Sequence, residues 1–257
     1  MYYLSSCSIV KNEDNYIDDF VNIHKHLGVE FFLFFDRSEN PLSEKYKGSD
    51  DIHVIHFPEP NRHAHAWREG VKYFQGKSKW VQFIDIDQVV VPMQTYDIKV
   101  MLQNYETVAA LSLNWHTFGS NGRDTEPPPG VSTYEAYTKR AVNLEPINNH
   151  VQSIVQVENV EYRTWDNPHF PPLVGQQQWN ANKQPISGPF NIPPAQDIGF
   201  IAHYYTRSKE YWANKLAKLR ADTGTPFGTM DDFNNHQNYL NAVDDNTVKD
   251  IWNRVKG

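Results

Sequence analysis

Residues 4–36 read LSSCSIVKNEDNYIDDFVNIHKHLGVEFFLFFD, and this stretch decides the fold. The segment LSSCSIV predicts a buried strand, and residues 12–27 predict a helix because most of their apolar side chains fall on one face. Gly28 stands where the C-terminal cap of that helix belongs, and residues 29–35 predict a second strand that Asp36 ends. A strand, a helix and a strand joined by short connections predict the start of an α/β sheet.

The same alternation continues along the chain. Residues 52–57 predict a third strand, residues 62–74 a helix and residues 80–86 a fourth strand. We therefore expect an α/β fold in which helices flank a mostly parallel sheet. Ligands of such sheets bind at the carboxyl ends of the strands, where this chain carries three polar groups. These groups are Lys11-Asn12-Glu13, Asp36-Arg37 and Asp85-Ile86-Asp87.

The second half of the chain is less regular. Residues 109–115 and 198–202 predict strands, whereas residues 119–130 predict a loop. Residues 165–197 show little periodicity, and long irregular segments in a compact domain are usually functional. A helix capped by Ser208 is predicted next, and two shorter helices are expected to follow it. The inward side chains of the capped helix are expected to be Tyr211, Trp212, Leu216 and Leu219.

The composition argues against several classes of protein. The 257 residues include 24 basic and 31 acidic side chains and no run of Lys and Arg, so nucleic-acid binding is not expected. Cys7 is the only cysteine, which excludes an intramolecular disulfide and a cysteine-based zinc site. Residues 1–10 lack the features of a signal peptide, and no apolar run approaches the roughly 18 residues of a transmembrane helix. These features predict a cytoplasmic protein without a membrane span.

The strongest chemical signal is FIDID at residues 83–87. Asp85 and Asp87 flank one apolar residue, and in an extended chain residues two apart point to the same side. Two neighbouring carboxylates repel each other and normally need a cation or hydrogen-bond donors nearby. Mg²⁺ and Mn²⁺ prefer carboxylate oxygen and bridge readily to phosphate. The pattern therefore favours a metal and phosphate site over its alternative, a solvated turn after a strand.

Several short motifs occur in an order that resembles nucleotide-sugar glycosyltransferases of the GT-A type, similar to glycosyltransferase families 2 and 92. The motifs in the first half are VKNE at residues 10–13, HLGV at 26–29, FD at 35–36 and WVQFIDID at 80–87. Those in the second half are NWHTFGS at 114–120, NPHF at 167–170, AHYYTRS at 202–208, and Lys215. The chain departs from the family pattern at Gln88, where a Glu usually follows the Asp-X-Asp.

The resemblance implies a metal-dependent glycosyltransferase with Mn²⁺ or Mg²⁺ as its cofactor. Its partners would be a nucleotide-diphosphate-sugar donor, with a UDP-sugar favoured, and a saccharide or glycan acceptor. Residues 1–257 would form one GT-A domain, with a nucleotide-sugar-binding half over 1–95 and an acceptor half with C-terminal helices over 96–257. Inverting and retaining transfer both stay open, as does the oligomeric state.

The resemblance also implies roles for individual residues. Asp85 and Asp87 would bind the metal together with His203, although His203 fits equally well as a partly buried histidine bonded to backbone. The residues expected to hold the nucleotide-sugar are Val10, Lys11, Asn12, Glu13, Asp36, Arg62, Asp85 and Ile86. For Asp36 the alternative is a turn residue that ends a strand.

Sugar contacts are expected near the strand over residues 109–115, because aromatic faces stack on sugar rings and a polar loop can bind their hydroxyls. The candidates are Trp115, His116, Gly119 and Ser120. The alternative for Trp115 is an ordinary core side chain.

Arg62, His63 and His65 stand near the start of the helix over residues 62–74. A helix N-terminus favours anions, so phosphate contact is one interpretation, and simple packing of the two histidines is the other. The spacing of the histidines is not that of a helical zinc site.

An inverting enzyme needs a general base within hydrogen-bond reach of the acceptor hydroxyl. The carboxylate candidates are Asp124, Glu126, Glu135 and Asp166, and His169 is a further candidate as base or sugar contact.

Two rival classes share this sheet type. A nucleotidyltransferase or a metal-dependent nucleotide-sugar hydrolase is one rival, and a nucleotidyltransferase would carry a Gly-rich basic loop where this chain has KNEDNY. A non-catalytic protein that binds carbohydrate or nucleotide-sugar is the other, and the intact pair of Asp85 and Asp87 disfavours it.

Overall fold

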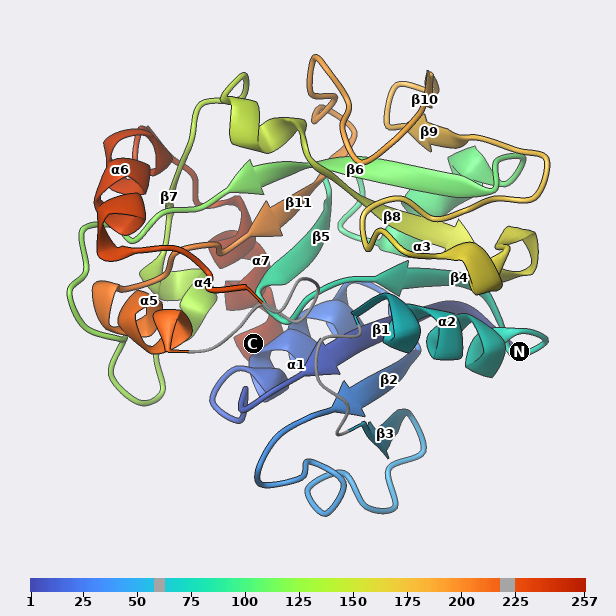
Figure 1. The fold of residues 1–257 in the computed structure, drawn as a ribbon, viewed down its shortest axis with the longest axis horizontal. Coiled ribbons are helices and arrows are strands. Elements are labelled where there is room, and N and C mark those ends of the chain that lie inside the picture. The colour runs from blue at the N-terminus through green and yellow to red at the C-terminus, as the bar shows by residue number, and fades with distance from the viewer. Residues whose placement is uncertain (58–62, 218–224) are drawn as a thin grey trace.

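The computed structural model describes residues 1–57, 63–217 and 225–257 (Figure 1). Its N-terminal part is a parallel sheet in the spatial order β3-β2-β1-β4. The strands are β1 (Tyr2–Val10), β2 (Phe31–Asp36), β3 (Ile52–His56) and β4 (Ser78–Phe83). Helix α1 (Ile17–His26) connects β1 to β2, and helix α2 (His63–Phe74) precedes β4. The predicted α/β architecture is confirmed.

The two helices cover opposite faces of this sheet, because successive side chains of a strand alternate between its faces. Phe32 and Phe34 of β2 pack against Phe20 of α1, with ring centroids 6.3 and 6.2 Å apart. Phe35 instead joins the cluster on the other face, which contains Trp67 of α2. A strand that is apolar on both faces, as FFLFF is, needs both layers to exclude water.

The sheet continues beyond β4 with strands from the second half of the chain, and among the described residues it is a mixed sheet of ten strands. Strand β8 (Val151–Gln156) runs antiparallel to β4, and β6 (Ala110–Thr117) runs antiparallel to β8. Strand β9 (Gln178–Asn180) is parallel to β6, and β10 (Pro185–Ile186) forms the edge. Strand β11 (Gly199–His203) branches from β6 and pairs with β5 (Gln88–Pro92).

The remaining elements are short and pack around this sheet (Figure 1). The helices are α3 (Ile98–Leu102), α4 (Thr133–Ala136), α5 (Lys209–Leu216), α6 (Met230–Leu240) and α7 (Thr247–Lys256). The 3-10 turns are η1 (Gln103–Tyr105), η2 (Pro146–Asn149), η3 (Val157–Asn159) and η4 (Tyr162–Thr164). A two-stranded ribbon joins β7 (Lys139–Arg140) to β12 (Val243–Asp244).

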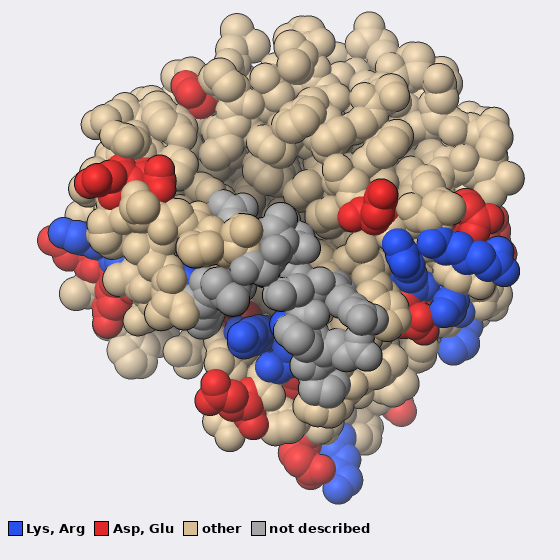
Figure 2. Space-filling view, in the orientation of Figure 1, with Lys and Arg blue, Asp and Glu red and all other residues tan. Residues whose placement is uncertain are grey.

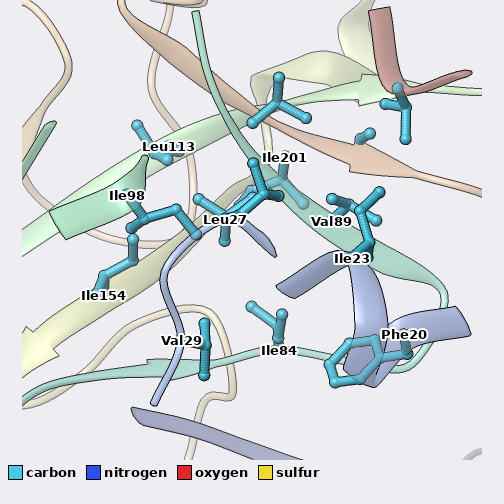
Figure 3. Packing of buried hydrophobic residues seen from close by; sticks show 14 of the residues in the cluster. Phe20, Ile23, Leu27, Val29, Ile84, Val89, Ile98, Leu113, Ile154 and Ile201 are labelled. Atoms are coloured by element: carbon cyan, nitrogen blue, oxygen red, sulfur yellow. The ribbon is translucent and has the colours of Figure 1, made fainter. Parts of the chain in front are cut away.

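The larger hydrophobic core joins the two halves of the chain, as Figure 3 shows. Phe20 and Ile23 of α1 belong to the same buried cluster as Val89 of β5, Ile154 of β8 and Ile201 of β11. The carboxyl end of β4 and the start of β5 are therefore held by packing from both sides. No helix among the described residues is long and apolar enough to cross a bilayer.

Several predicted boundaries were wrong. The first helix begins at Ile17 rather than residue 12, because residues 12–16 form a turn in which Asn12 has a φ of +55°. The fourth strand ends at Phe83 rather than residue 86, and β5 and β8 were not predicted.

The C-terminal helices also differ from expectation. Helices α6 and α7, with 11 and 10 residues, are longer than the eight-residue α5. Trp212 of α5 is buried as predicted, whereas Tyr211 and Leu216 are half-buried. Leu219 lies outside the described residues.

Candidate active site

A cavity of about 450 Å³ lies at the carboxyl ends of β1 and β4. This is the edge at which an α/β sheet of this kind binds its ligands. The lining residues from the first half of the chain include Lys11, Asn12, Glu13, Tyr16, Arg37, His63, Asp85, Ile86, Asp87 and Gln88. Those from the second half include Trp115, His169, His203, Tyr205, Tyr211 and Lys215.

The two aspartates lie in the connection between β4 and β5, not in an extended strand as predicted. Gln88 is fully buried at the start of β5, and its Oε1 accepts a hydrogen bond from the Asp85 backbone N–H at 3.2 Å. The amide therefore shapes the turn that presents Asp85 and Asp87 to the cavity. It does so without adding a third negative charge at the position where the family pattern has Glu.

Asp87 faces two basic side chains of the cavity. Its Oδ1 lies 3.6 Å from Nε2 of His203, and its Oδ2 lies 3.8 Å from Nζ of Lys215. Burial alone would raise the pKa of Asp87, but His203, Lys215 and Arg207 together hold that pKa well below its usual range. The backbone oxygen of Asp87 also accepts a hydrogen bond from Tyr204 N–H at 2.8 Å. Asp87 is thus an ionised group on a rigid backbone.

Asp85 faces the first residue of α2. Nε2 of His63 lies 3.5 Å from Oδ1 of Asp85, and the His63 ring packs edge-on against Trp67 at a centroid distance of 4.5 Å. His65 points elsewhere, toward Glu69 and the ring of Phe57. Of the two histidines considered near the helix start, His63 lines the cavity and His65 packs outside it. Arg62 lies outside the described residues.

The connection after β1 supplies Lys11, Asn12 and Glu13 to the cavity wall, as the sequence indicated. Asn12 is fixed to the loop after β2, because its backbone N–H donates to Oγ of Ser38 at 2.8 Å. Val10, by contrast, is fully buried in the hydrophobic core. The side chain of Val10 therefore has no exposed surface for the predicted contact with the nucleotide-sugar.

Asp36 also departs from its predicted role. It is fully buried, and its two carboxylate oxygens accept the backbone N–H groups of Ser38 at 2.8 Å and Leu42 at 2.6 Å. It orders the loop after β2, which was the alternative interpretation. The neighbouring Arg37 lines the cavity in its place.

Arg207 is a buried cation next to the cavity that the sequence did not single out. Its guanidinium lies over the ring of Tyr16 at 4.0 Å and over that of Tyr211 at 4.5 Å. Nη1 of Arg207 is 3.8 Å from Oε2 of Glu13. This contact links the connection after β1 to the segment between β11 and α5. The AHYYTRS motif and Lys215 were the available signal, but only His203 received a role from them.

Trp115 lines the cavity, but its ring is largely covered. It stacks flat on His150 at a centroid distance of 4.6 Å with an interplanar angle of 11°, and it forms an edge-to-face pair with His203 at a centroid distance of 4.3 Å. One face is therefore not available to a sugar ring. Trp115 acts as a spacer between the two histidines.

The structure places the other three predicted sugar contacts inside the protein and not on the cavity wall. His116 stacks on Phe200 at 4.0 Å, and burial, with the nearby Arg140, lowers its pKa to about 4. Gly119 lies against α6, where a Cβ would come within 2.5 Å of Oδ1 of Asn241. Ser120 is 1% exposed and donates its hydroxyl to Gln237 of the same helix.

The five candidate bases differ in whether they line the cavity. Asp124 and Asp166 are exposed and do not line the cavity. Glu126 accepts hydroxyl hydrogens from three side chains and Glu135 closes a capping box, so both have structural roles. Of the five candidates, His169 lines the cavity.

A divalent metal ion would find an incomplete set of protein ligands here. Within residues 1–57, 63–217 and 225–257, no group of three His, Cys, Asp or Glu side chains is arranged to hold a metal ion. Asp87 and His203 offer one carboxylate and one imidazole, both of which Mn²⁺ accepts. These residues fit a metal ion whose remaining ligands are oxygens of a bound diphosphate and water.

Comparison with known proteins identifies the family of the chain. The profile of glycosyltransferase family 92 matches residues 2–238, and the chain therefore belongs to glycosyltransferase family 92.

Two relatives of this family are distant. A family 92 protein of Oryza sativa subsp. japonica is 23% identical over 146 residues, which are 52% of this chain and 24% of that protein. One of Ricinus communis is 24% identical over 177 residues, 61% of this chain and 29% of that protein. The chain thus spans about a quarter of the length of these relatives.

Solved structures resemble the chain only weakly. A 4-diphosphocytidyl-2C-methyl-D-erythritol synthase aligns with a TM-score of 0.38 at 12% identity, over 65% of this chain and 79% of that one. TarS of S. aureus aligns with a TM-score of 0.37 at 15% identity, over 65% of this chain and 32% of that one. Likeness of this degree carries no argument about the site.

Proposed function

We propose that this chain transfers a sugar from a nucleotide-diphosphate-sugar donor to a saccharide or glycan acceptor. Membership of glycosyltransferase family 92 supports transfer of a sugar. One structural observation carries the rest of the proposal, namely the grouping of Asp87, His203 and Lys215 on the wall of a single cavity. Its volume falls within the range of about 300–1,000 Å³ that is typical of small-molecule sites.

The leaving diphosphate is the part of the donor that this grouping suits. The side chain of Lys215 is 13% exposed and lies beside Asp87, and its Nζ also lies 3.4 Å from the backbone oxygen of Tyr205. A cation held in a water-poor site stabilises developing negative charge more strongly than one in water does. Lys215 would therefore bind the diphosphate as the sugar departs.

A divalent metal ion, Mn²⁺ or Mg²⁺, is part of the proposal. When bound, it would neutralise charge on the leaving diphosphate. Asp87 and His203 would hold it, and Asp85 would contribute from the same turn. Their oxygen and imidazole donors support this assignment.

The nucleoside end of the donor is proposed to lie along Lys11, Asn12, Glu13 and Arg37, which line the cavity at the ends of β1 and β2. Uridine is the preferred base, an inference from the family resemblance. Residues 1–95 would thus form the donor half of one catalytic domain, and residues 96–257 would form the acceptor half.

The test is release of nucleotide diphosphate from a panel of UDP-, GDP- and dTDP-sugars, with Mn²⁺ and after exhaustive chelation. We expect release from at least one donor, its loss on chelation and its recovery with Mn²⁺ or Mg²⁺. Asp87→Asn should be inactive, and Asp124→Asn, which changes an exposed carboxylate outside the cavity, should match the wild type. Release by a folded Asp87→Asn variant at the wild-type rate would refute the assignment.

A further inference from the structure

His169 occupies a firmly anchored position in the cavity wall. It follows η4 in a tight turn, where its backbone N–H donates to Oδ1 of Asn167 at 2.9 Å. Trp165, just before this turn, is 1% exposed and packs edge-on against Phe83 at 4.9 Å. Phe83 is the last residue of β4, so the turn that carries His169 rests on the strand that leads into Asp85.

The hydrogen bonds of Gln152 determine which nitrogen of His169 carries the proton. The Nε2 amide group of Gln152 donates to the backbone oxygen of Phe83, which can only accept. The Oε1 of Gln152 is thereby directed to Nδ1 of His169, 2.7 Å away. Because an amide oxygen also only accepts, Nδ1 must carry the hydrogen. The lone pair of the neutral ring is then on Nε2.

The surroundings keep this ring neutral. Burial, followed by the neighbouring His63, His150 and His203, lowers the pKa of His169 to about 3. A neutral imidazole has one ring nitrogen whose lone pair can accept a proton.

The carboxylates of the same cavity are less suited to accept a proton. Asp87 faces Lys215 and His203, Asp85 faces His63, and Glu13 faces the guanidinium of Arg207. Each of these carboxylates therefore already faces a basic side chain.

We propose that Nε2 of His169 is the general base of the transfer, and that Gln152 is the positioning residue that fixes its tautomer. The acceptor oxygen forms a bond to the anomeric carbon as its O–H bond breaks and the proton passes to Nε2. The bond from the anomeric carbon to the diphosphate breaks with its electron pair remaining on the diphosphate. His169 then returns the proton to solvent. Such a single displacement inverts the anomeric centre. The inference rests on the proposed sugar transfer.

The first experiment uses water as the acceptor, since the natural acceptor is not identified. Hydrolysis of the active sugar nucleotide is followed by proton NMR, and the first anomer released should have the configuration opposite to that in the donor. His169→Ala should lower the release rate about 100-fold or more, because general-base catalysis typically contributes at least that factor. Its Kd for the nucleotide diphosphate, measured by calorimetry, should stay within about twofold of the wild type. The matched control is His65→Ala, a histidine of α2 outside the cavity.

The second experiment tests Gln152 through a pH profile. Gln152→Glu keeps an acceptor at Nδ1 but places a negative charge there, which raises the pKa of His169. The base acts in its neutral form, so the acidic limb of the release rate should move to higher pH in Gln152→Glu. A purely structural role for Gln152 would lower the rate without moving that limb.

The outcomes separate the two proposals. Release of the retained anomer, or wild-type turnover by His169→Ala, would overturn the role of His169 and leave sugar transfer in place. A wild-type chain that binds nucleotide diphosphates but releases none from any sugar nucleotide would refute the proposed function and this inference with it.

Discussion

The two walls of the cavity differ in origin and in charge. One wall, here called the aspartate wall, consists of residues 11–13, Arg37 and residues 85–87 from the carboxyl ends of β1, β2 and β4. The other, the histidine wall, consists of Trp115, His169 and His203 from the second half of the chain. Figure 2 shows few charged side chains among the described residues over β9 and β10, in the same half as the histidine wall.

This difference suggests that the two walls bind different parts of the reactants. Lys11 and Arg37 of the aspartate wall suit an anionic diphosphate, because ionised partners of opposite charge in a shielded site interact strongly. The ring nitrogens of the histidine wall suit hydroxyl groups, which need hydrogen-bond donors and acceptors. The aspartate wall is therefore assigned to the donor and the histidine wall to the reacting sugar and its acceptor.

The largest effect is expected from the aspartate wall. Asp87→Asn keeps the shape of the side chain but removes the charge that faces His203 and Lys215. We expect nucleotide-diphosphate release to fall about 100-fold or more, as for loss of a charged group that acts in the transition state. Circular dichroism at 25 °C should show a folded protein. A folded variant with undiminished release would remove Asp87 from the catalytic group.

A smaller effect, on nucleotide-diphosphate binding, is expected from Lys215, the cation that lies beside Asp87. Lys215→Met removes a charge-assisted contact of about 2 kcal/mol with the diphosphate, so binding should weaken about 30-fold. Calorimetry with nucleotide diphosphate measures this. Lys209→Met, an exposed lysine of the same helix, is the matched control and should bind as the wild type does. Equal affinity of both variants would show that Lys215 neutralises Asp87 and does not touch the ligand.

His203 belongs to the histidine wall and contacts Asp87 of the aspartate wall. We expect its substitution to change the metal requirement. If it binds the metal ion, His203→Ala should raise the metal concentration for half-maximal activity by about 10-fold, or about 1.4 kcal/mol. Nucleotide-diphosphate binding should weaken only when metal is present. A lowered melting temperature with an unchanged metal requirement would identify His203 as a packing residue instead.

The smallest effect on activity is expected outside both walls. Gly119→Ala places a Cβ within 2.5 Å of Asn241 Oδ1 and 2.7 Å of the backbone oxygen of Leu240. Overpacking of this kind typically costs about 1–3 kcal/mol, which thermal unfolding would record. The KM for the donor should not change. A raised KM at unchanged stability would indicate that Gly119 contacts the sugar.

The aspartate wall could be predicted largely from the sequence, because it is local. The strands that place Lys11 and Asp85 are apolar runs, and polar residues that follow such runs fall on one edge of the sheet. The same reasoning misassigned Asp36, because sequence position does not show that its carboxylate turns back to the N–H groups of Ser38 and Leu42.

The second half of the chain, which supplies the histidine wall, was less predictable, because its geometry depends on distant contacts. The hydroxyl of Ser120 is hydrogen-bonded to Gln237, 117 residues later. The ring of His169 is hydrogen-bonded to Gln152, on a strand that was not predicted. Arg207 lies between two tyrosines, of which Tyr16 comes from the other end of the chain. Pairings of this range leave no periodic signal in the sequence.

The central claim is that the aspartate wall binds a nucleotide diphosphate through a group organised around Asp87. Calorimetric titration of UDP, GDP and dTDP into the wild-type chain, with and without Mn²⁺, tests it most directly when repeated on Asp87→Asn. We predict binding of at least one nucleotide, UDP first, that strengthens with Mn²⁺ and loses this metal dependence in the variant. No binding of any of the three with Mn²⁺ present, or identical titrations for the two proteins, would contradict the account.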